Sequence, residues 1–363
     1  MQFTVSVKKF AVALGVVSRV ANSRSSLPIL SNLLIKAEKN RVCISATNLN
    51  IVSQVFIGSK VLKNGSITIP ARLIQEYISA INEETVDLGV NNNKINISTK
   101  LHKTIINGTD AKEFPEMPEL GAEKSWEIAS TKLKKYFSNT IICASTDDTK
   151  PILGSVLVYT EDNKTVFAAT DGYRLAEQKA KTTAFAQTKF IIPANTVSEL
   201  IRVLPDDETV VGIKTNEQLA EFSFGDTKIT TRLIGGSFPD YKNLIPKNFS
   251  NIAVVDKKEL ANTTKLAGLF ARDTAGSINI STNEPGQELG IKTVASQTGQ
   301  NESTIPAKVT GTADITINAR YINDALSQIS SETATISFNE KLQPCVIKGE
   351  DPDYLQVIMP LKS

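Results

Sequence analysis

Ile67-Thr68-Ile69-Pro70-Ala71-Arg72 is a strand-like apolar run that leads into a helical pattern. The same design recurs as Phe190-Ile191-Ile192-Pro193-Ala194-Asn195 and as Ile315-Thr316-Ile317-Asn318-Ala319-Arg320. The positions of Pro70, Pro193 and Asn318 are 123 and 125 residues apart. A period this long indicates that a whole domain was triplicated, because solenoid repeats are about 20 to 50 residues long. The sequence therefore predicts three tandem copies of one domain.

An amphipathic helix is predicted directly after each copy of this segment. The apolar residues follow the spacing i, i+3, i+4 and i+7, which is typical of a helix with one buried stripe. The three stripes are Leu73, Ile74, Tyr77, Ile78 and Ile81; Val197, Leu200, Ile201 and Leu204; and Tyr321, Ile322, Ala325, Leu326 and Ile329.

Two further landmarks recur in the same register and locate the domain boundaries. A strand that leads into a helix begins near Phe3, Trp126 and Ile252, while Phe114-Pro115 and Phe238-Pro239 close the first two copies. Proline lacks an N–H and restricts the residue before it, so it suits the exit from a strand into a linker. We therefore expect domains at residues 1–120, 121–248 and 249–363.

Between the landmarks the sequence predicts short strands. Runs such as 32–36, 42–47, 86–90 and 94–98 alternate or are continuously apolar, and polar turn residues separate them. Each copy is expected to hold two helices of about 12 to 15 residues and roughly eight strands. The expected fold class is α+β, with the helices of each copy packed on antiparallel sheets.

Composition and cysteine usage narrow the class of protein. With 41% hydrophobic and 21% charged residues, the chain of 363 residues has the composition of a soluble globular protein. No apolar run approaches the roughly 18 to 20 residues of a membrane span, and Met1-Gln2-Phe3 enters a strand without a signal-peptide layout. Cys43, Cys143 and Cys345 are isolated, which favours buried, reduced thiols and a cytoplasmic location.

Residues suited to catalysis are scarce. His102 is the single histidine, and its neighbours Lys100 and Lys103 favour an exposed position. The sequence contains no nucleophile elbow, zinc-protease motif, paired C-x-x-C or Walker motif. The acid pairs Asp147-Asp148 and Asp206-Asp207 fall at expected helix ends or turns. We therefore expect no catalytic residue, no metal site, no cofactor and no enzyme activity.

Four blocks resemble the bacterial DNA polymerase III beta subunit family, the replicative sliding clamps. They are residues 27–34 (LPILSNLL), 168–176 (AATDGYRLA), 236–241 (GSFPDY) and 357–361 (VIMPL), and they occur in the family's order along a triplicated chain. The resemblance implies a head-to-tail homodimer that closes a ring of six domains around duplex DNA. It also implies a non-catalytic processivity factor that does not bind membranes. Its implied partners are double-stranded DNA, bound without sequence preference, the catalytic subunit of the replicative polymerase, the clamp loader, and repair and ligation proteins with clamp-binding peptides.

Charge offers limited support for DNA binding. The formal net charge of +2 is low for a dedicated DNA-binding protein. Basic residues nevertheless gather on the predicted helices, where they would attract phosphates without reading bases; they include Lys8, Lys9, Arg24, Lys134 and Arg272. By the resemblance, Arg24, Arg72 and Lys150 match positive positions near DNA, whereas Ala194 stands where some members carry arginine.

The resemblance also implies a peptide-binding groove between the second and third domains. Aliphatic walls and a flexible methionine suit Leu and Phe anchors. Asn243 and the Lys362-Ser363 ending depart from some members of the family. The implied groove residues are Leu153, Thr170, Gly172, Tyr173, Arg174, Leu175, Pro239, Asn243, Leu244, Pro344, Val357, Met359, Pro360 and Leu361.

A subunit interface is implied in the same way. Leu269-Phe270 match an apolar pair of the family, and they would pack against Leu73, Tyr77 and Ile78 of the other chain. Lys100 and Lys103 would face Glu284 and Glu288 of the partner.

Two other classes of protein remain open from the residues themselves. A non-catalytic, triplicated β-rich binding module would explain the repeats, although the isolated cysteines count against an extracellular one. A carboxylate-dependent hydrolase could hold its acids far apart in the sequence.

Overall fold

Two compact units make up the chain. The computed structural model describes residues 1–21, 27–118, 120–121, 124–180, 188–295 and 299–361. One unit comprises Met1–Lys132 with Arg202–Leu233, and the other comprises Leu133–Ile201 with Ile234–Ser363. The second sequence repeat thus contributes to both units, because its strands pair with those of the first repeat on one side and the third on the other.

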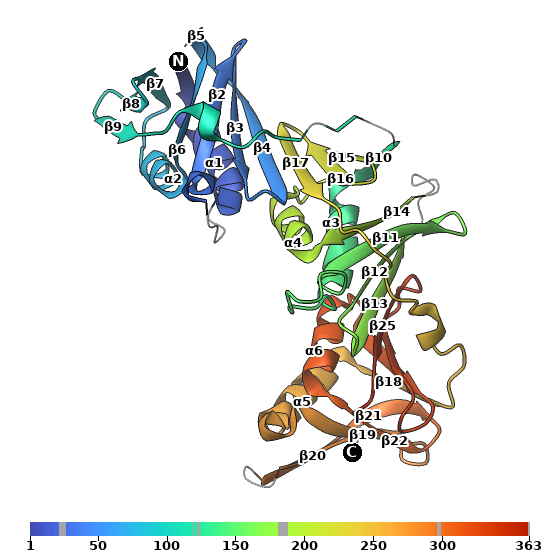
Figure 1. Cartoon of the computed structure of the whole chain (residues 1–363). Coiled ribbons are helices and arrows are strands. Elements are labelled where there is room, and N and C mark those ends of the chain that lie inside the picture. The colour runs from blue at the N-terminus through green and yellow to red at the C-terminus, as the bar shows by residue number, and fades with distance from the viewer. Residues whose placement is uncertain (22–26, 119, 122–123, 181–187, 296–298, 362–363) are drawn as a thin grey trace. The chain divides into compact units, whose positions relative to one another are not determined.

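The first unit contains two antiparallel sheets (Figure 1). Its strands are β1 (Gln2–Ser6), β2 (Asn32–Glu38), β3 (Arg41–Thr47), β4 (Ile51–Gly58), β5 (Lys60–Lys63), β6 (Gly65–Pro70), β7 (Thr85–Asn91), β8 (Lys94–Ser98), β9 (Lys103–Asn107), β10 (Lys124–Ala129), β15 (Val210–Thr215), β16 (Leu219–Phe224) and β17 (Thr227–Arg232). The sheet of five strands has the order β5-β1-β7-β8-β9, and the sheet of eight strands has the order β10-β15-β16-β17-β4-β3-β2-β6.

The second unit contains one continuous sheet. Its strands are β11 (Ser155–Glu161), β12 (Lys164–Thr170), β13 (Arg174–Ala180), β14 (Lys189–Pro193), β18 (Asn251–Asp256), β19 (Ser277–Asn283), β20 (Glu288–Ala295), β21 (Gly299–Thr310), β22 (Ala313–Asn318), β23 (Thr333–Phe338), β24 (Cys345–Lys348) and β25 (Tyr354–Ile358). The sheet has the order β14-β11-β12-β13-β25-β24-β23-β18-β21-β20-β19-β22.

Each sequence repeat contributes two helices. The bounds are α1 (Val7–Ala21), α2 (Ala71–Ser79), α3 (Ser130–Ile141), α4 (Ala194–Val203), α5 (Lys257–Phe270) and α6 (Ala319–Gln328). Helices α1 and α2 pack on each other, and α1 covers β3 and β4; α5 and α6 pack on each other in the same way (Figure 1). The expected α+β class is confirmed.

The expected helix length is right for α1, α3 and α5 but too long for α2, α4 and α6, which have 9, 10 and 10 residues. The last apolar residues of the three stripes, Ile81, Leu204 and Ile329, lie just beyond the helix ends and are buried all the same. The apolar pattern therefore predicted the burial of these three residues correctly but overstated the helical length, and Leu73 of the first stripe is exposed. In α4, Pro205 follows directly and disfavours a helical conformation at Leu204.

Local signals explain several chain reversals and helix starts. Asn92 and Asn93 have φ values of 50° and 57°, the left-handed conformation of a tight hairpin turn that asparagine tolerates. Asp256 caps α5, because its side chain accepts a hydrogen bond from the Glu259 N–H at 2.9 Å. None of the described helices is long and apolar enough to cross a membrane.

Candidate functional site

The turn between β12 and β13 forms one part of the candidate groove. Thr170 Oγ1 donates to the carbonyl oxygen of Arg174 at 2.7 Å and accepts from the Gly172 N–H at 3.1 Å. Asp171 Oδ1 accepts from the N–H groups of Tyr173 and Arg174. Gly172 has a φ of 92°, which disfavours residues with a Cβ. The turn is therefore rigid, and it leaves the Tyr173 side chain 64% exposed.

Arg174 ties this turn to the third repeat. Its side chain is 8% exposed and forms ion pairs with Asp171 at 3.0 Å and with Asp324 of α6. Its guanidinium also lies over the Tyr321 ring, 4.4 Å from the centroid. These contacts occupy the guanidinium and connect the turn to helix α6.

The last residues of the chain run beside the turn. Strand β25 pairs with β13, with Leu175 opposite Val357. The Met359 N–H donates to the carbonyl oxygen of Tyr173 at 2.9 Å. Met359, Pro360 and Leu361 are half-buried, and the Leu361 N–H donates to Thr316 of β22 at 2.8 Å. Backbone pairing therefore brings residues that are far apart in sequence to one place.

The segment after Gly236 covers the neighbouring sheet face. Phe238 and Tyr241 are buried in one apolar cluster with Leu157, Leu175 and Val357. These two aromatic side chains anchor a segment whose other side chains, Pro239, Asn243 and Leu244, point outward and are exposed.

A buried polar network fixes that segment. The Tyr241 hydroxyl donates to Glu177 at 2.7 Å and lies 3.0 Å from the Tyr159 hydroxyl, and Lys179 pairs with Glu177 at 3.3 Å. Burial and the nearby Glu177 charge raise the pKa of Tyr241. The sequence analysis did not identify Glu177 and Tyr159 as residues that hold this segment in place. A strand pattern does not reveal which buried side chain will find a hydrogen-bond partner in a distant segment.

The remaining groove residues lie on two other segments. Leu153 is half-buried, and its carbonyl oxygen accepts from the Ser145 N–H at 2.8 Å. Pro344 is half-buried and directly precedes β24, whose Cys345 pairs with Ile358. Pro344 and Met359 thus lie at the same end of that ladder.

Most of the basic residues considered for DNA contact lie on helices or short turns. Lys8 and Lys9 are exposed in the first turn of α1, Lys134 is half-buried in α3, and Arg272 is exposed just after α5. Arg24 lies outside the described residues.

Two of these cations already have carboxylate neighbours. Arg72 is exposed and pairs with Glu76 at 2.8 Å, and Lys150 is exposed and pairs with Asp147 at 3.6 Å. Exposed pairs of this kind are weak, so both cations remain able to exchange their partner for a phosphate.

The residues considered for a subunit interface differ in exposure. Leu269, in the last turn of α5, is 48% exposed and Phe270 is half-buried. Leu266 is 54% exposed one turn earlier, so α5 has a longer apolar stripe than the sequence analysis recognised. Lys100, Lys103 and Glu288 are exposed.

The apolar residues of α2 do not all reach the surface. Leu73 is exposed and Tyr77 is half-buried, but Ile78 is 0% exposed. Ile78 is part of the core of its own repeat. It can contribute to an interface only indirectly, by packing under the exposed residues of α2.

The histidine and the three cysteines differ in burial. No group of three or more His, Cys, Asp or Glu side chains that could hold a metal occurs among the described residues. His102 is exposed. Cys143 and Cys345 are fully buried, and burial raises the pKa of Cys345 to about 12. Cys43 departs from the expectation of a buried thiol, because it is only half-buried.

Three α+β repeats in tandem, joined by sheets that continue from one repeat to the next, define a clamp-type protein. Family models of the DNA polymerase III beta subunit match the chain in order: the N-terminal domain at residues 1–118, the central domain at 127–240 and the C-terminal domain at 242–362. The chain belongs to the DNA polymerase III beta subunit family.

Full-length relatives and solved structures agree with this assignment. The chain is 27% identical to the beta sliding clamp of Synechococcus elongatus over 360 residues, covering 96% of each chain. It is 27% identical to that of Bacillus subtilis over 378 residues, covering 100% of each. The crystal structure of the Bacillus subtilis sliding clamp superposes with a TM-score of 0.95 at 26% identity, covering 100% of this chain and 99% of that one. The Bartonella birtlesii sliding clamp bound to griselimycin gives 0.94 at 26% identity and covers 100% of both.

Proposed function

We propose that this chain is a DNA sliding clamp, a processivity factor that encircles duplex DNA and tethers the replicative polymerase and other proteins. The observation that carries the proposal is the full-length match to all three clamp domains in order, combined with clamp geometry along the whole chain. The proposed domains are residues 1–120, 121–248 and 249–363. The protein acts as a scaffold without catalysis of its own, in the cytoplasm, where bacterial DNA is replicated.

The repeat pattern of strand pairing supports a head-to-tail dimer. Strand β4 of the first repeat pairs with β17 of the second, and β13 of the second pairs with β25 of the third. The strands in the matching positions are β21 in the third repeat and β9 in the first. Over the described residues, β9 pairs only with β8, and residues 299–306 of β21 pair only with β20, whereas residues 307–310 pair with β18. Pairing of β9 with β21 of another chain would form a third junction of the same kind as β4 with β17 and β13 with β25. It would also cover an exposed edge strand, which could otherwise pair with other chains and aggregate.

Apolar side chains beside these two edges fit the same junction. Leu266, Leu269 and Phe270 of α5 would meet Leu73 and Tyr77 of the partner chain. The exposed Lys100 and Lys103 would face Glu288 across the boundary. Two such heterologous contacts close a ring when the rotation per chain is correct, and near-equivalent repeats supply that rotation.

A ring of two chains would have twelve helices around its hole. At roughly 10 Å between neighbouring axes the circumference is about 120 Å and the diameter about 40 Å, which admits duplex DNA with water around it. Basic residues such as Lys8, Lys9, Lys134, Arg72 and Lys150, with Arg24 and Arg272, would attract phosphates without fixing a register.

The groove beside Met359 is the proposed docking site for short peptides of partner proteins. The fixed turn at Gly172, the half-buried Met359 and Pro360, and the exposed Leu244 offer aliphatic surface next to backbone polar groups. Such a surface accepts Leu and Phe anchors. The partners that we propose are the polymerase catalytic subunit, the clamp loader, and repair and ligation proteins.

Retention on circular DNA tests the clamp mechanism. Ordinary binding through 6 to 10 phosphate contacts weakens about 10³ to 10⁵-fold between 50 and 200 mM salt. A ring loaded onto nicked circular DNA should withstand that salt, and a single cut of the circle should release it. Equal retention on circular and linear DNA, with a steep salt dependence on both, would show binding from outside and refute the proposal.

Truncation tests the groove separately. Deletion of residues 359–363 should abolish binding of a peptide with Leu and Phe anchors, because both the half-buried Met359 and the wall formed by Pro360 and Leu361 are lost. Circular dichroism should report an unchanged fold. Unchanged peptide affinity after the deletion would place the docking site elsewhere.

A further inference from the structure

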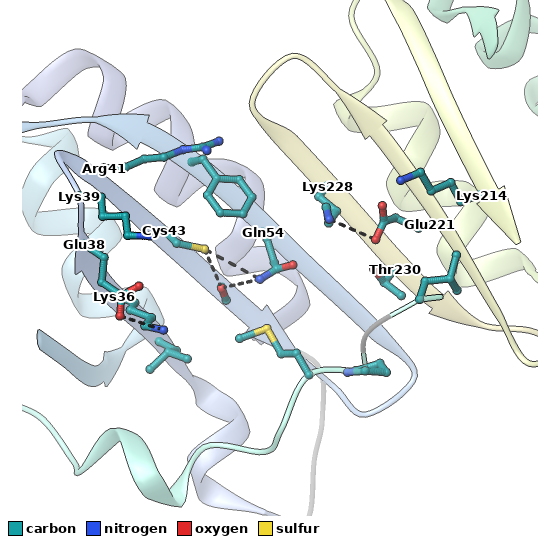
Figure 2. A pocket seen from close by; sticks show the side chains of 16 residues that line it. Lys36, Glu38, Lys39, Arg41, Cys43, Gln54, Lys214, Glu221, Lys228 and Thr230 are labelled. Carbon is teal, nitrogen blue, oxygen red and sulfur yellow. Dashed lines mark hydrogen bonds and ion pairs between the residues drawn. The ribbon is translucent and has the colours of Figure 1, made fainter. Parts of the chain in front are cut away.

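A cavity of about 780 Å³ lies within the first unit and shares no lining residue with the groove (Figure 2). Its walls include Leu34 and Cys43, which alternate along β2 and β3 with the fully buried Ile35 and Ile44. Because successive side chains of a strand point to opposite faces, the cavity occupies the sheet face opposite to the core. Strands β4, β15, β16 and β17 complete the walls, and Met117 contributes to the rim.

Positive charge dominates this cavity. Its lining contains five cationic side chains and two carboxylates. Lys36 pairs with Glu38 at 3.0 Å, and Lys228 pairs with Glu221 at 3.2 Å. The remaining cations are Lys39, Arg41 and Lys214, of which Arg41 pairs with Asp226 at 3.7 Å. Lys39 and Lys214 have no ion pair among the described residues, and they stand on opposite walls in Figure 2.

The cavity also has apolar and hydrogen-bonding surface. Leu34, Phe56 and Met117 supply apolar side chains. The Gln54 amide lies 3.4 Å from Ser45 Oγ and 3.9 Å from Cys43 Sγ. A ligand of matching chemistry would therefore combine negative charge with one apolar group.

The second repeat shows what covers the equivalent face. In the first repeat Asn32 of β2 pairs with Pro70 of β6, and in the second repeat Ser155 of β11 pairs with Pro193 of β14. Because the two pairings have the same register, the strands of the two repeats can be aligned residue by residue. The aligned positions are Ser45 with Ala168, Thr230 with Val357, and Glu221 with Val346.

Apolar residues in the second repeat thus correspond to polar ones in the first. In the second repeat, the chain's own segment inserts Phe238 and Tyr241 into the apolar face, and Tyr241 donates to Glu177. Glu177 aligns with Gln54 of the cavity. In the first repeat the corresponding segment, aligned through Phe114-Pro115 and Phe238-Pro239, places Met117 at the position of Tyr241, and the cavity remains beside it for a second peptide segment.

We propose that the cavity binds an acidic peptide segment of a partner protein, with one apolar anchor among its carboxylates. The anchor sits against Leu34 and Met117, and the flanking carboxylates meet Lys39 and Lys214. A peptide suits the site better than a nucleic acid, because its separated carboxylates can meet Lys39 and Lys214 and avoid Glu38 and Glu221, whereas a phosphate backbone carries a charge at every unit. Moreover, the Arg41 guanidinium already covers the Phe56 ring at 4.2 Å, so that face cannot stack on a base.

Direct binding tests the charge argument. The probe is a fluorescein-labelled hexapeptide with one apolar residue, acetyl-Asp-Glu-Phe-Glu-Asp-Glu, measured by anisotropy at low salt on the full chain. Lys39→Glu with Lys214→Glu should weaken binding about tenfold or more, because two attractions become repulsions. The control variant Lys60→Glu with Lys94→Glu makes the same change in net charge at exposed residues elsewhere in the unit, and it should bind within about twofold of the wild type.

Alkylation of Cys43 locates the bound peptide. Cys143 and Cys345 are 0% exposed, so iodoacetamide should add once to the native protein, at Cys43. A peptide concentration of ten times Kd should slow this reaction about tenfold, because only the free fraction reacts. A peptide with Lys in place of Asp and Glu should not protect the thiol.

Each outcome decides the proposal. Peptide binding that ignores the charge reversal, or that leaves the Cys43 reaction rate unchanged, would overturn it. Hexathymidylate binding that is lost on charge reversal, with no peptide binding, would assign the cavity to nucleic acid and also overturn it. The deletion of residues 359–363 should leave acidic-peptide binding intact, so failure here is distinguishable from failure of the groove or of the clamp mechanism.

Discussion

Substitution of Arg174 by methionine tests the ion pairs that connect the turn at Gly172 to helix α6. Arg174 is 8% exposed, and its partners Asp171 and Asp324 have side chains that are 14% and 25% exposed. Arg174→Met keeps a long, flexible side chain but removes the cation from Asp171 and leaves Asp324 with only the more distant Arg320. The turn at Gly172 and helix α6 then lose their ionic connection.

The expected cost follows from the burial of the pair. Breaking a buried ion pair by removing one partner costs about 3 to 5 kcal/mol. The lower end, about 3 kcal/mol, applies because Asp324 is partly exposed and keeps Arg320 at 3.8 Å. For a unit of this size, each kcal/mol shifts Tm by about 2 to 4 °C, so Tm should fall by about 6 to 12 °C.

Differential scanning calorimetry and groove-peptide anisotropy check this reasoning together. Arg72→Met is the matched control, because its pair with Glu76 has a similar N–O distance but is exposed, and it should change neither readout. Addition of Asp324→Asn to Arg174→Met should restore part of the loss, since one unpaired charge disappears. A Tm drop below about 2 °C for Arg174→Met would refute the buried ion-pair interpretation.

Three further outcomes follow from the structure. Leu269→Ala with Phe270→Ala should give folded monomers by analytical ultracentrifugation, because two anchors together contribute several kcal/mol to association; a dimer that persists at nanomolar concentration would contradict the interface. Tyr241→Phe should lower stability near neutral pH by about 1.5 to 3 kcal/mol, because Glu177 loses a hydrogen-bond donor. Its raised pKa means that Tyr241 stabilises the fold fully below about pH 10 and loses this effect as pH rises above it, so the wild type and the Tyr241→Phe variant should converge in urea titrations at alkaline pH; parallel curves would contradict this.

Sequence periodicity predicted the repeats and the fold class because both depend on local patterns. The segment that ends in Pro70 recurs twice at nearly equal spacing, and the apolar stripes that follow it include most of the buried residues of α2, α4 and α6. Helix ends were less predictable. A residue such as Leu204 can be buried whether or not it is helical, so apolar spacing does not specify where hydrogen bonding stops.

The chemistry of the groove could be named from sequence only through family resemblance. Thr170, Gly172 and Asp171 are close in sequence, and their turn follows from local hydrogen bonds. Neither the pairing of Leu175 with Val357 nor the contact between Arg174 and Asp324 has a local signal, because each joins residues more than 100 positions apart.

The sequence by itself determined the triplication, the α+β class and the scarcity of catalytic side chains, because composition and period need no tertiary contact. Only the tertiary structure decided which apolar residues stay outside the core. Ile78 is buried, whereas Leu266 and Leu269 are exposed. The aligned sheet faces of two repeats also differ, because one is an apolar surface that receives Tyr241 and the other is a basic cavity beside Cys43. These differences depend on how strands from distant parts of the chain pair and on what then covers each face, which no local pattern of residues specifies.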